Sequence, residues 1–562
     1  MRNLFAFAAF GLAFAFGSAQ AAAPTPEAEA CRALGSASLA EALGEPDLKI
    51  QVARFNPAFG LTESSQIPAN CELVGTLHAR TGIDGQAYAI RFHLRMPAEW
   101  NGRFFFQGGS GFGGVMGDAL GNLLGRQPLP ALSLGYAVLS EDMGHENTAN
   151  NQTAQGGALS FGHDPQARLD YAYASQALTT KIAKAIVQRH YGQAPRYSYF
   201  VGCGKGGQEG MAMSQRYPEL FDGVLAGAPE FRPARLALSQ AFEVQTLGRL
   251  TLKTRQTDPM GRPDLYRAFS NDDLALISFA VLSACDGLDG LEDGWIGAVS
   301  ACTTEEVKPE LSKITCADGQ NGGCVSPEQI EALLTLQAGA RDGQGKPLYA
   351  AWPWHAGFGG DGNPGWRLWK LGTGGGDEPN ARNMDVGAGS LAAVFSSPPV
   401  VLADTPEAVS DFLMGYDLGS AALSDQADAD STDLKAFRKR GGKLILFHGG
   451  ADPVASLDDT AAWFQALDRA EGGEAAGFAR LYAVPNMGHC VGGLTVDRFD
   501  AFGALVDWVE HAKPPAILPA GPGRDSPWEG RSRPLCPYPA EARYRGQGDP
   551  EAAESFECRK PG

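Results

Sequence analysis

Short apolar runs alternate with amphipathic runs in two separate parts of the chain. In the first part, residues 87–230, the apolar runs predict strands at 88–94, 103–107, 136–140, 197–201 and 223–226. Apolar spacing of the helical kind predicts helices at 169–191 and 206–217. The second part, near the C-terminus, has the same alternation and predicts strands at 443–447 and 480–484 and helices at 460–471 and 498–511. This alternation is typical of a doubly wound α/β sheet, so we expect both parts to build one sheet.

The stretch between these two parts has a different pattern. Residues 231–440 break into segments rich in Gly, Pro, Asp and Trp and contain four of the cysteines. We therefore predict a lid domain at 231–440, inserted into a discontinuous core made of residues 22–230 and 441–562. A chain of 562 residues, 44% of them hydrophobic, is too long for a single core and long enough for this arrangement.

Charge and the N-terminal pattern narrow the class of protein. The formal net charge of −18 disfavours nucleic acid or an anionic membrane as a partner, because the overall field repels both. Arg2, an apolar run at 4–16 and the A-x-A pattern at 19–21 predict a signal peptide over residues 1–21. No later run approaches the roughly 20 apolar residues that a membrane helix needs. We expect a secreted or periplasmic protein.

The ten cysteines fit an oxidising compartment. Proximity along the chain suggests four disulfides: Cys31 with Cys71, Cys285 with Cys302, Cys316 with Cys324, and Cys536 with Cys558. Cys203 and Cys490 remain, and each stands beside a residue of catalytic type. A zinc site is disfavoured because the chain has no CxxC pair.

The residues 199–207, Tyr-Phe-Val-Gly-Cys-Gly-Lys-Gly-Gly, resemble the strand-to-helix turn of a nucleophile elbow, G-x-S-x-G. Gly204 occupies the position of the nucleophilic serine. Flanking glycines suit such a turn because its tip is strained and the following helix packs close to the strand. A glycine-rich turn without chemistry is the alternative.

Two further residues support a catalytic site. Asp452 follows the predicted strand 443–447, and His489 follows the strand 480–484. This gives the chain order nucleophile, acid, histidine of α/β-hydrolases. Taken singly, an Asp before Pro is usually a turn former and a loop histidine is usually exposed, but their positions after successive strands favour an acid and a base.

Oxyanion donors are expected from two backbone segments. The N–H after the nucleophile position belongs to Lys205, and the glycine-rich loop 107–114 offers a second, for which Gly109 is the best candidate. An ordinary flexible loop is the alternative. A dinucleotide site is disfavoured because no acidic ribose ligand follows the loop at the expected place.

These motifs resemble the tannase and feruloyl esterase family of α/β-hydrolases. The matching positions are Gly202, Cys203, Asp452, His489, Cys490, the glycine pair 206–207, and the runs 215–218 and 221–229. The resemblance implies a Cys203–Cys490 disulfide that ties the elbow to the histidine loop. Two positions depart from the family pattern: the serine is Gly204, and the arginine after the glycine pair is Gln208.

The loop 285–296 concentrates carboxylates among glycines, which suits a hard cation, although its spacing is not that of an EF-hand. Without the resemblance, solvated turn carboxylates would be favoured. The resemblance implies a structural Ca²⁺ in the lid, bound by the side chains of Asp286, Asp289 and Asp293 and the carbonyls of Leu291 and Trp295.

The resemblance implies an exported carboxylic ester hydrolase whose ligand is a small aromatic ester, a hydroxybenzoate or hydroxycinnamate. Of five lid aromatics, we expect most in the core and one or two at the site: Trp352, Trp354, Phe358, Trp366 and Trp369. With Gly204, direct attack by water activated at His489 is the route that remains.

A pseudoenzyme or binding protein that keeps the pocket is the alternative function. A serine-to-glycine change in an otherwise ordinary enzyme would give the same sequence. Three residues are poor replacements for the serine. Cys203 is one residue from the tip and expected in a disulfide, and Lys205 and Ser214 do not stand at the tip either, the latter lying further along the helix.

Overall fold

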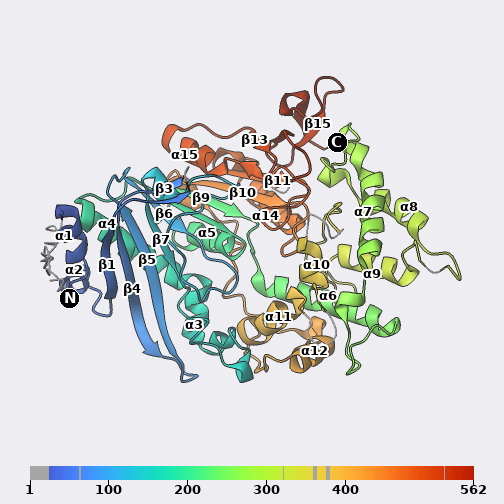
Figure 1. Ribbon diagram of the computed structural model, residues 1–562, viewed down its shortest axis with the longest axis horizontal. Coiled ribbons are helices and arrows are strands. Elements are labelled where there is room, and N and C mark those ends of the chain that lie inside the picture. The colour runs from blue at the N-terminus through green and yellow to red at the C-terminus, as the bar shows by residue number, and fades with distance from the viewer. Residues whose placement is uncertain are drawn as a thin grey trace, which may run out of the picture.

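The computed structural model describes residues 25–62, 65–320, 322–358, 364–374, 380–523 and 526–561 (Figure 1). The predicted signal peptide lies outside the described residues. Within them, no helix is both long enough and apolar enough to cross a membrane.

A nine-stranded sheet forms the centre of the fold. Its order is β1-β4-β5-β7-β6-β8-β9-β10-β11. The strands are β1 (Lys49–Asn56), β4 (Asn70–Thr81), β5 (Ala87–Pro97), β6 (Arg103–Gln107), β7 (Ala137–Glu141), β8 (Tyr197–Cys203), β9 (Gly223–Gly227), β10 (Lys443–Gly449) and β11 (Ala479–Val484). Every predicted strand is present, and the two parts of the chain do build one sheet.

The sheet is mixed: an antiparallel part is added to the parallel, helix-covered part that the sequence predicted. Strands β7, β6, β8, β9, β10 and β11 are parallel, whereas β1, β4, β5 and β7 pair antiparallel. Strands β1 and β4 were not predicted. A short turn joins β4 to β5, and such a connection is long enough only for antiparallel neighbours, because parallel strands need a crossover.

Helices cover both faces of the sheet. One hydrophobic cluster joins Phe104 and Phe106 of β6 to helices α4 (Ser175–Tyr191), α5 (Lys205–Arg216) and α14 (Leu457–Ala470). A second joins Phe105 to α15 (Ala501–His511) on the opposite face. The alternation of these phenylalanines follows from the two-residue period of a strand.

Two predicted helices are divided in the structure. Residues 169–191 contain the end of α3 (Pro165–Leu169), a π-helical segment at Asp170–Ala174 and then α4. Residues 498–511 begin as strand β12 (Arg498–Phe499), and α15 starts only after Asp500, whose side chain accepts the Gly503 N–H and caps the helix.

The chain between β9 and β10 is helical. It contains α6 (Pro233–Lys253), α7 (Asn271–Cys285), α8 (Thr304–Ile314), α9 (Pro327–Gln337), α10 (Pro364–Lys370), α11 (Arg382–Gly389), α12 (Pro406–Gly415) and α13 (Lys435–Lys439). Most of these helices pack around a hydrophobic cluster that includes Leu247, Val281, Leu333 and Leu413. In Figure 1 this segment lies beside the end of the sheet where β10 and β11 finish.

The remaining elements are short. Helices α1 (Pro26–Ala33) and α2 (Ser38–Leu43) precede β1, and β2 (Phe59–Thr62) pairs with β3 (Ser65–Ile67). In the C-terminal segment, β12 pairs with β13 (Leu518–Gly521), β13 with β14 (Arg533–Leu535), and β15 (Glu541–Tyr544) with β16 (Phe556–Arg559).

All ten cysteines form disulfides. The four pairs suggested by proximity are confirmed, and so is the Cys203–Cys490 pair implied by the family resemblance. The last of these connects residues 287 positions apart and joins the end of β8 to the loop after β11.

Candidate active site

The turn between β8 and α5 has the backbone of a nucleophile elbow. Gly204 stands at its tip with φ 58° and ψ −114°, a left-handed φ that suits glycine. Gly206 follows on the first turn of α5, and a Cβ there would lie 2.6 Å from the Gly109 carbonyl oxygen. This close approach of helix to loop accounts for the glycine at 206.

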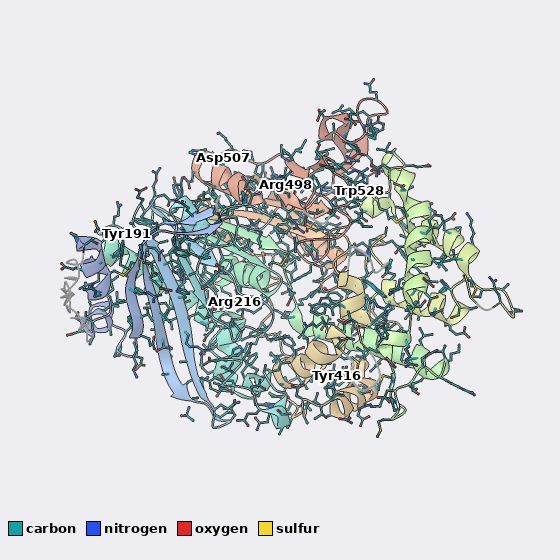
Figure 2. The ribbon with its side chains drawn as sticks, in the orientation of Figure 1. Tyr191, Arg216, Tyr416, Arg498, Asp507 and Trp528 are labelled. Carbon is teal, nitrogen blue, oxygen red and sulfur yellow. A yellow bond between two sulfur atoms is a disulfide. The ribbon has the colours of Figure 1, made fainter. Side chains whose placement is uncertain are left out.

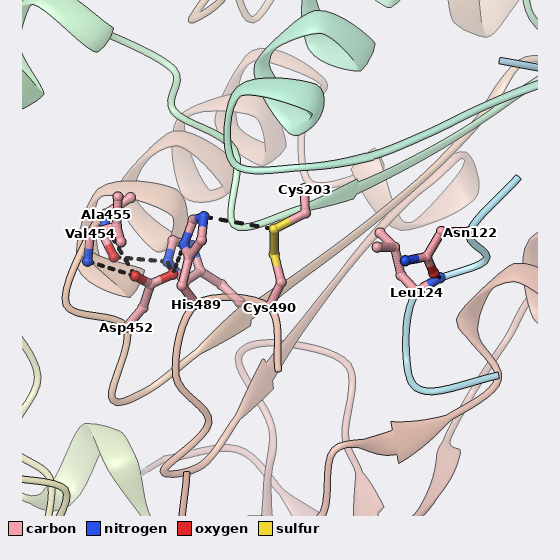
Figure 3. The surroundings of a disulfide bond; sticks show 9 residues. Asn122, Leu124, Cys203, Asp452, Val454, Ala455, His489 and Cys490 are labelled. Carbon is pink, nitrogen blue, oxygen red and sulfur yellow. Dashed lines mark hydrogen bonds and ion pairs between the residues drawn. A yellow bond between two sulfur atoms is a disulfide. The ribbon is translucent and has the colours of Figure 1, made fainter. Parts of the chain in front are cut away.

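Asp452 and His489 meet at the carboxyl end of the sheet. The Nδ1 atom of His489 lies 2.8 Å from Asp452 Oδ2 (Figure 3). The other carboxylate oxygen of Asp452 accepts the N–H groups of Val454 and Ala455, at 2.8 and 3.2 Å. These bonds hold the carboxylate in one orientation, so that the imidazole presents its Nε2 atom to the elbow.

The buried His448 supports the acid from within β10. Its Nε2 atom lies 3.3 Å from Asp452 Oδ2 and 3.0 Å from the Ala455 carbonyl oxygen. Burial acts to raise the pKa of Asp452, but His489 and His448 outweigh it and hold that pKa below its ordinary value. Asp452 is therefore ionised across the neutral range.

His489 responds in the opposite direction. Burial acts to lower its pKa, but the Asp452 carboxylate and, more weakly, Glu230 raise it above the ordinary value. The side chain keeps 29% of its exposure. A histidine so placed can exchange protons with a substrate while its charged form is stabilised.

The Cys203–Cys490 disulfide clamps this arrangement. Cys203 precedes Gly204, Cys490 follows His489, and the Cys203 sulfur lies 3.7 Å from His489 Nε2 (Figure 3). A covalent bond between the two loops fixes the distance between the elbow tip and the imidazole, which the packing of two loops alone would leave less defined.

Two side chains converge on the position where a serine Cβ would stand. A Cβ built on Gly204 would lie 2.6 Å from His489 Nε2, 3.0 Å from His489 Cε1 and 3.3 Å from Glu230 Oε1. The first contact is shorter than carbon contacts normally allow, so the imidazole lies partly in the space of that side chain.

The two predicted oxyanion donors differ in their surroundings. Lys205 is the first residue of α5, where a backbone N–H has no intrahelical acceptor. The Gly109 N–H instead donates to Glu209 Oε2 at 2.9 Å. Gly109 can serve an oxyanion only if this bond is released, so its role stays a prediction.

Buried charges lie behind the elbow. The Lys205 amine donates to the Tyr171 carbonyl oxygen at 2.8 Å and lies 4.2 Å from the centre of the Tyr171 ring. Burial raises the pKa of Glu209 against the opposing effect of Lys205. The Lys205 amine is thus held by the π-helical segment behind the elbow.

A pocket lies between the glycine-rich loop and the helices that follow β9. Its lining includes Phe112 from the glycine-rich loop, Glu230, Val454 and Trp369 of α10. Of the five aromatics between β9 and β10, Trp369 is half-buried here, whereas Phe358 and Trp366 belong to the hydrophobic cluster and Trp352 and Trp354 are buried with them.

The carboxylates proposed for calcium lie in the segment after α7. Asp286 accepts the N–H groups of Asp293 and Trp295, each at 3.1 Å, and Asp293 pairs with Arg533 at 2.5 Å. The other oxygen of Asp293, Oδ1, is buried without a hydrogen bond. Burial, with the charges of Asp293 and Asp286, raises the pKa of Asp289 to about 7.

This donor set fits a hard cation in its chemistry, since a divalent ion would offset the repulsion among the three carboxylates and give Asp293 Oδ1 a partner. The three carboxylates are not drawn tightly together, however. Within the described residues, only Cys203, His489 and Cys490 bring three possible metal-ligand atoms within 4.8 Å of one another. The two cysteines of this group form a disulfide.

The C-terminal segment covers this loop. Trp528, labelled in Figure 2, packs edge-on against Trp295 with ring centroids 5.6 Å apart. Arg531 lies over Trp528 and donates to the Asp293 carbonyl oxygen. The loop is therefore held by the tail as well as by its own turns.

Sequence reasoning placed Gly204, Asp452, His489 and Lys205 at one site, and the structure brings them together. It missed Glu230, which follows β9 directly. Its position offered a signal, because the carboxyl ends of parallel strands are where sites form in such sheets. It also missed Glu209, whose contact with Gly109 depends on how α5 packs against the loop.

Comparisons with known proteins agree over most of the chain. The family model described as tannase and feruloyl esterase matches residues 71–559. Mono(2-hydroxyethyl) terephthalate hydrolase of Piscinibacter sakaiensis is 40% identical over 91% of this chain and 88% of its own length. A probable feruloyl esterase of Arthroderma benhamiae is 28% identical over 91% and 89%. The crystal structure of feruloyl esterase B from Aspergillus oryzae has a TM-score of 0.71 at 20% identity, covering 95% of this chain and 100% of that one.

Proposed function

The chain belongs to the tannase and feruloyl esterase family, and we propose that it is an exported hydrolase of aromatic carboxylic esters that works without a serine nucleophile. The observation that carries the proposal is the Asp452–His489 pair, with Nδ1 2.8 Å from the carboxylate and Nε2 facing the elbow tip. A protein that only bound esters would not need an imidazole held in this way.

In an ordinary enzyme of this type a serine would attack the ester and form an acyl-enzyme. With Gly204 at the tip, water attacks the carbonyl carbon directly, and His489 is the group that transfers protons. Asp452 orients the imidazole and stabilises its charged form. The Lys205 N–H, at the start of α5, stabilises the negative charge that develops on the carbonyl oxygen.

The substrate class follows from the pocket and the relatives. Phe112, Trp369 and Phe395 offer aromatic faces beside Glu230, which suits a flat aromatic acyl group. The names of two relatives refer to an ester of terephthalate and to ferulate. We therefore propose methyl ferulate, methyl gallate and mono(2-hydroxyethyl) terephthalate as candidates.

The test is hydrolysis of these three esters and of an activated phenyl ester by the purified mature protein. Slow hydrolysis that His489→Ala abolishes is the expected result. Tight binding of methyl ferulate with no hydrolysis above that of the His489→Ala variant would replace the proposal by a binding protein. Hydrolysis that is equal in both proteins would place the chemistry elsewhere.

We further propose a structural calcium in the loop after α7. Asp286, Asp289 and Asp293 and the carbonyls of Leu291 and Trp295 would hold it. Its contribution would be to fix this loop against the C-terminal segment, since Asp293 also pairs with Arg531 and Arg533. No catalytic step involves it.

The division into a core at 22–230 and 441–562 and a lid at 231–440 also remains a proposal, as does export. Five disulfides and the lack of a membrane-spanning helix among the described residues support an oxidising, extracytoplasmic location.

A further inference from the structure

Glu230 is a carboxylate without a partner at the centre of the site. Among the described residues, no hydrogen bond to its carboxylate is present, although most acidic side chains around the site have such bonds. Its Oε1 atom faces the same point as His489 Nε2, the Cβ position of residue 204, at 3.3 and 2.6 Å. It also lines the pocket with Phe112 and Trp369.

These two distances place a carboxylate and an imidazole beside the elbow tip. The Cβ point itself is one bond length from the Gly204 Cα, so a water oxygen would stand farther out, above the tip, between His489 Nε2 and Glu230 Oε1. A serine Cβ would clash with the imidazole in its present position, whereas glycine leaves the space above the tip to water. A carboxylate and an imidazole therefore flank the position from which water would attack.

The charges around Glu230 favour a defined protonation pattern. Burial raises its pKa, and Asp452 and Glu209 add to this, while His489 and Lys205 oppose it. Tyr171, from the π-helical segment, also lies in its field. Burial acts to lower the pKa of His489, but Asp452 and then Glu230 raise it, so an ionised Glu230 favours the charged imidazole.

We propose that Glu230 and His489 form a base–acid pair that hydrolyses the ester without a covalent intermediate, Glu230 as the base and His489 as the acid. The inference rests on the proposed function and names a further catalytic residue for it. It assigns to Glu230 the role that a serine enzyme gives to its histidine in the first step.

Water loses a proton to the Glu230 carboxylate while its oxygen bonds to the carbonyl carbon. The C–O bond to the leaving alcohol then breaks, and the alcohol oxygen takes a proton from the His489 imidazolium. The products are the aromatic acid and the alcohol, and proton transfer from Glu230 to His489, directly or through solvent, restores the starting state.

The first experiment compares Glu230→Gln in two backgrounds, the natural Gly204 protein and the Gly204→Ser variant. In the natural background we expect kcat to fall at least about 50-fold, with KM changed less than about threefold, as removal of a general base does. In the serine background, where the hydroxyl replaces the water, the same substitution should change kcat less than about threefold. An equal loss in both backgrounds would mean that Glu230 only positions His489, and would overturn the inference.

The pH profile of the unaltered protein is a second measurement that needs no variant. The pair predicts a bell-shaped dependence of kcat/KM on pH. Activity falls at low pH because Glu230 becomes protonated, and the pKa of this limb lies above the ordinary glutamate value of 4.5. Activity falls at high pH because His489 loses its proton, and the pKa of this limb lies above the ordinary histidine value of 6.5. A serine enzyme needs a neutral histidine, so Gly204→Ser should instead gain activity as pH rises through the His489 pKa. A natural protein with that rising profile would contradict the pair.

Intact mass measured during a single turnover separates the two possible roles of the carboxylate. No acyl adduct is expected on the natural protein. An adduct that Glu230→Gln abolishes would make Glu230 a nucleophile and overturn its role as base.

Failure of the proposed function is distinguishable from failure of this inference. If the natural protein shows no hydrolysis that depends on His489, both fall. If hydrolysis depends on His489 but is unchanged by Glu230→Gln, only the role of Glu230 falls.

Discussion

The Nε2 atom of His489 lies 2.6 Å from the point at which a Cβ on Gly204 would stand. In a serine enzyme the imidazole must leave room for that side chain. Here the imidazole occupies the room, while the backbone of the elbow keeps its left-handed φ of 58°. The elbow and its base are therefore arranged around a glycine, and this relation leads to the first prediction.

Gly204→Ser should convert the protein into a serine esterase. The backbone already suits the elbow, so the main adjustment is a displacement of the His489 ring, and kcat should rise at least about 100-fold because attack through serine becomes available. Strain from a side chain at positive φ should cost about 1 kcal/mol of unfolding free energy. Hydrolysis of methyl ferulate and thermal melting check both effects.

Gly204→Ala is the matched control. It adds the same Cβ without the hydroxyl, so it should lose the activity of the natural protein, because the methyl group displaces the imidazole and narrows the space above the tip from which water attacks. Activity equal to that of the natural protein would show that water does not attack from above the tip.

Asp452→Asn should lower both the rate and the pKa of His489. Asp452 is the first of the charges that raise that pKa, so its removal moves the His489 limb of the pH profile to lower pH. We expect a loss of about 100-fold in kcat, since the amide neither holds the ring in the same tautomer nor stabilises its charge. A profile that does not shift would mean that another group carries the limb.

Replacing both Cys203 and Cys490 by alanine should reduce stability and activity together. The bridge closes a loop across 287 residues, so its loss should cost about 3–5 kcal/mol of unfolding free energy. Activity should fall because the elbow and the histidine loop lose their covalent connection. Denaturant unfolding and ester hydrolysis measure the two effects.

The control is the double alanine variant of Cys316 and Cys324. This bridge spans only 8 residues and lies between α8 and α9, away from the site. Its removal should cost less stability and leave kcat unchanged. A loss of kcat in this variant would show that the stability of the helical segment, not the clamp, governs turnover.

Trp369→Ala should raise KM for aromatic acyl esters and leave KM for an acetyl ester nearly unchanged. The indole lines the pocket beside Glu230, where it can stack on an aromatic ring at about 1–2 kcal/mol, or about 5- to 30-fold in KM. Trp354→Phe, a change in a buried tryptophan of the same helical segment, serves as the control for general destabilisation. Equal effects on both esters would contradict a role in acyl recognition.

Chelation should lower the melting temperature if the loop after α7 holds calcium. Adding Ca²⁺, but not Mg²⁺, should restore it, because the site is built from several oxygen ligands around a larger ion. Asp289→Asn should abolish the response without affecting the disulfides. A melting temperature that does not change on chelation would contradict the calcium site. The aspartates would then act only through the turn hydrogen bonds of Asp286 and the ion pair of Asp293 with Arg533.

The strand and helix pattern was enough to locate Asp452, His489 and the elbow, because residues after successive parallel strands meet at one edge of a sheet. It was not enough for the antiparallel half of the sheet. Strands β1 and β4 pair through a register that depends on contacts across the sheet, and a local pattern does not contain that register.

What the sequence determined by itself was the identity of the turn, the order of acid and histidine, and the missing hydroxyl at residue 204, and it suggested the four disulfides between cysteines close along the chain. The tertiary structure decided which groups lie beside residue 204, where the hydroxyl is missing. Whether Glu230 and His489 face the same point depends on how the segment after β9 leaves the sheet beside the elbow and on how the disulfide holds the histidine loop. Such distances between residues far apart in the chain are set by packing, which only the folded molecule fixes.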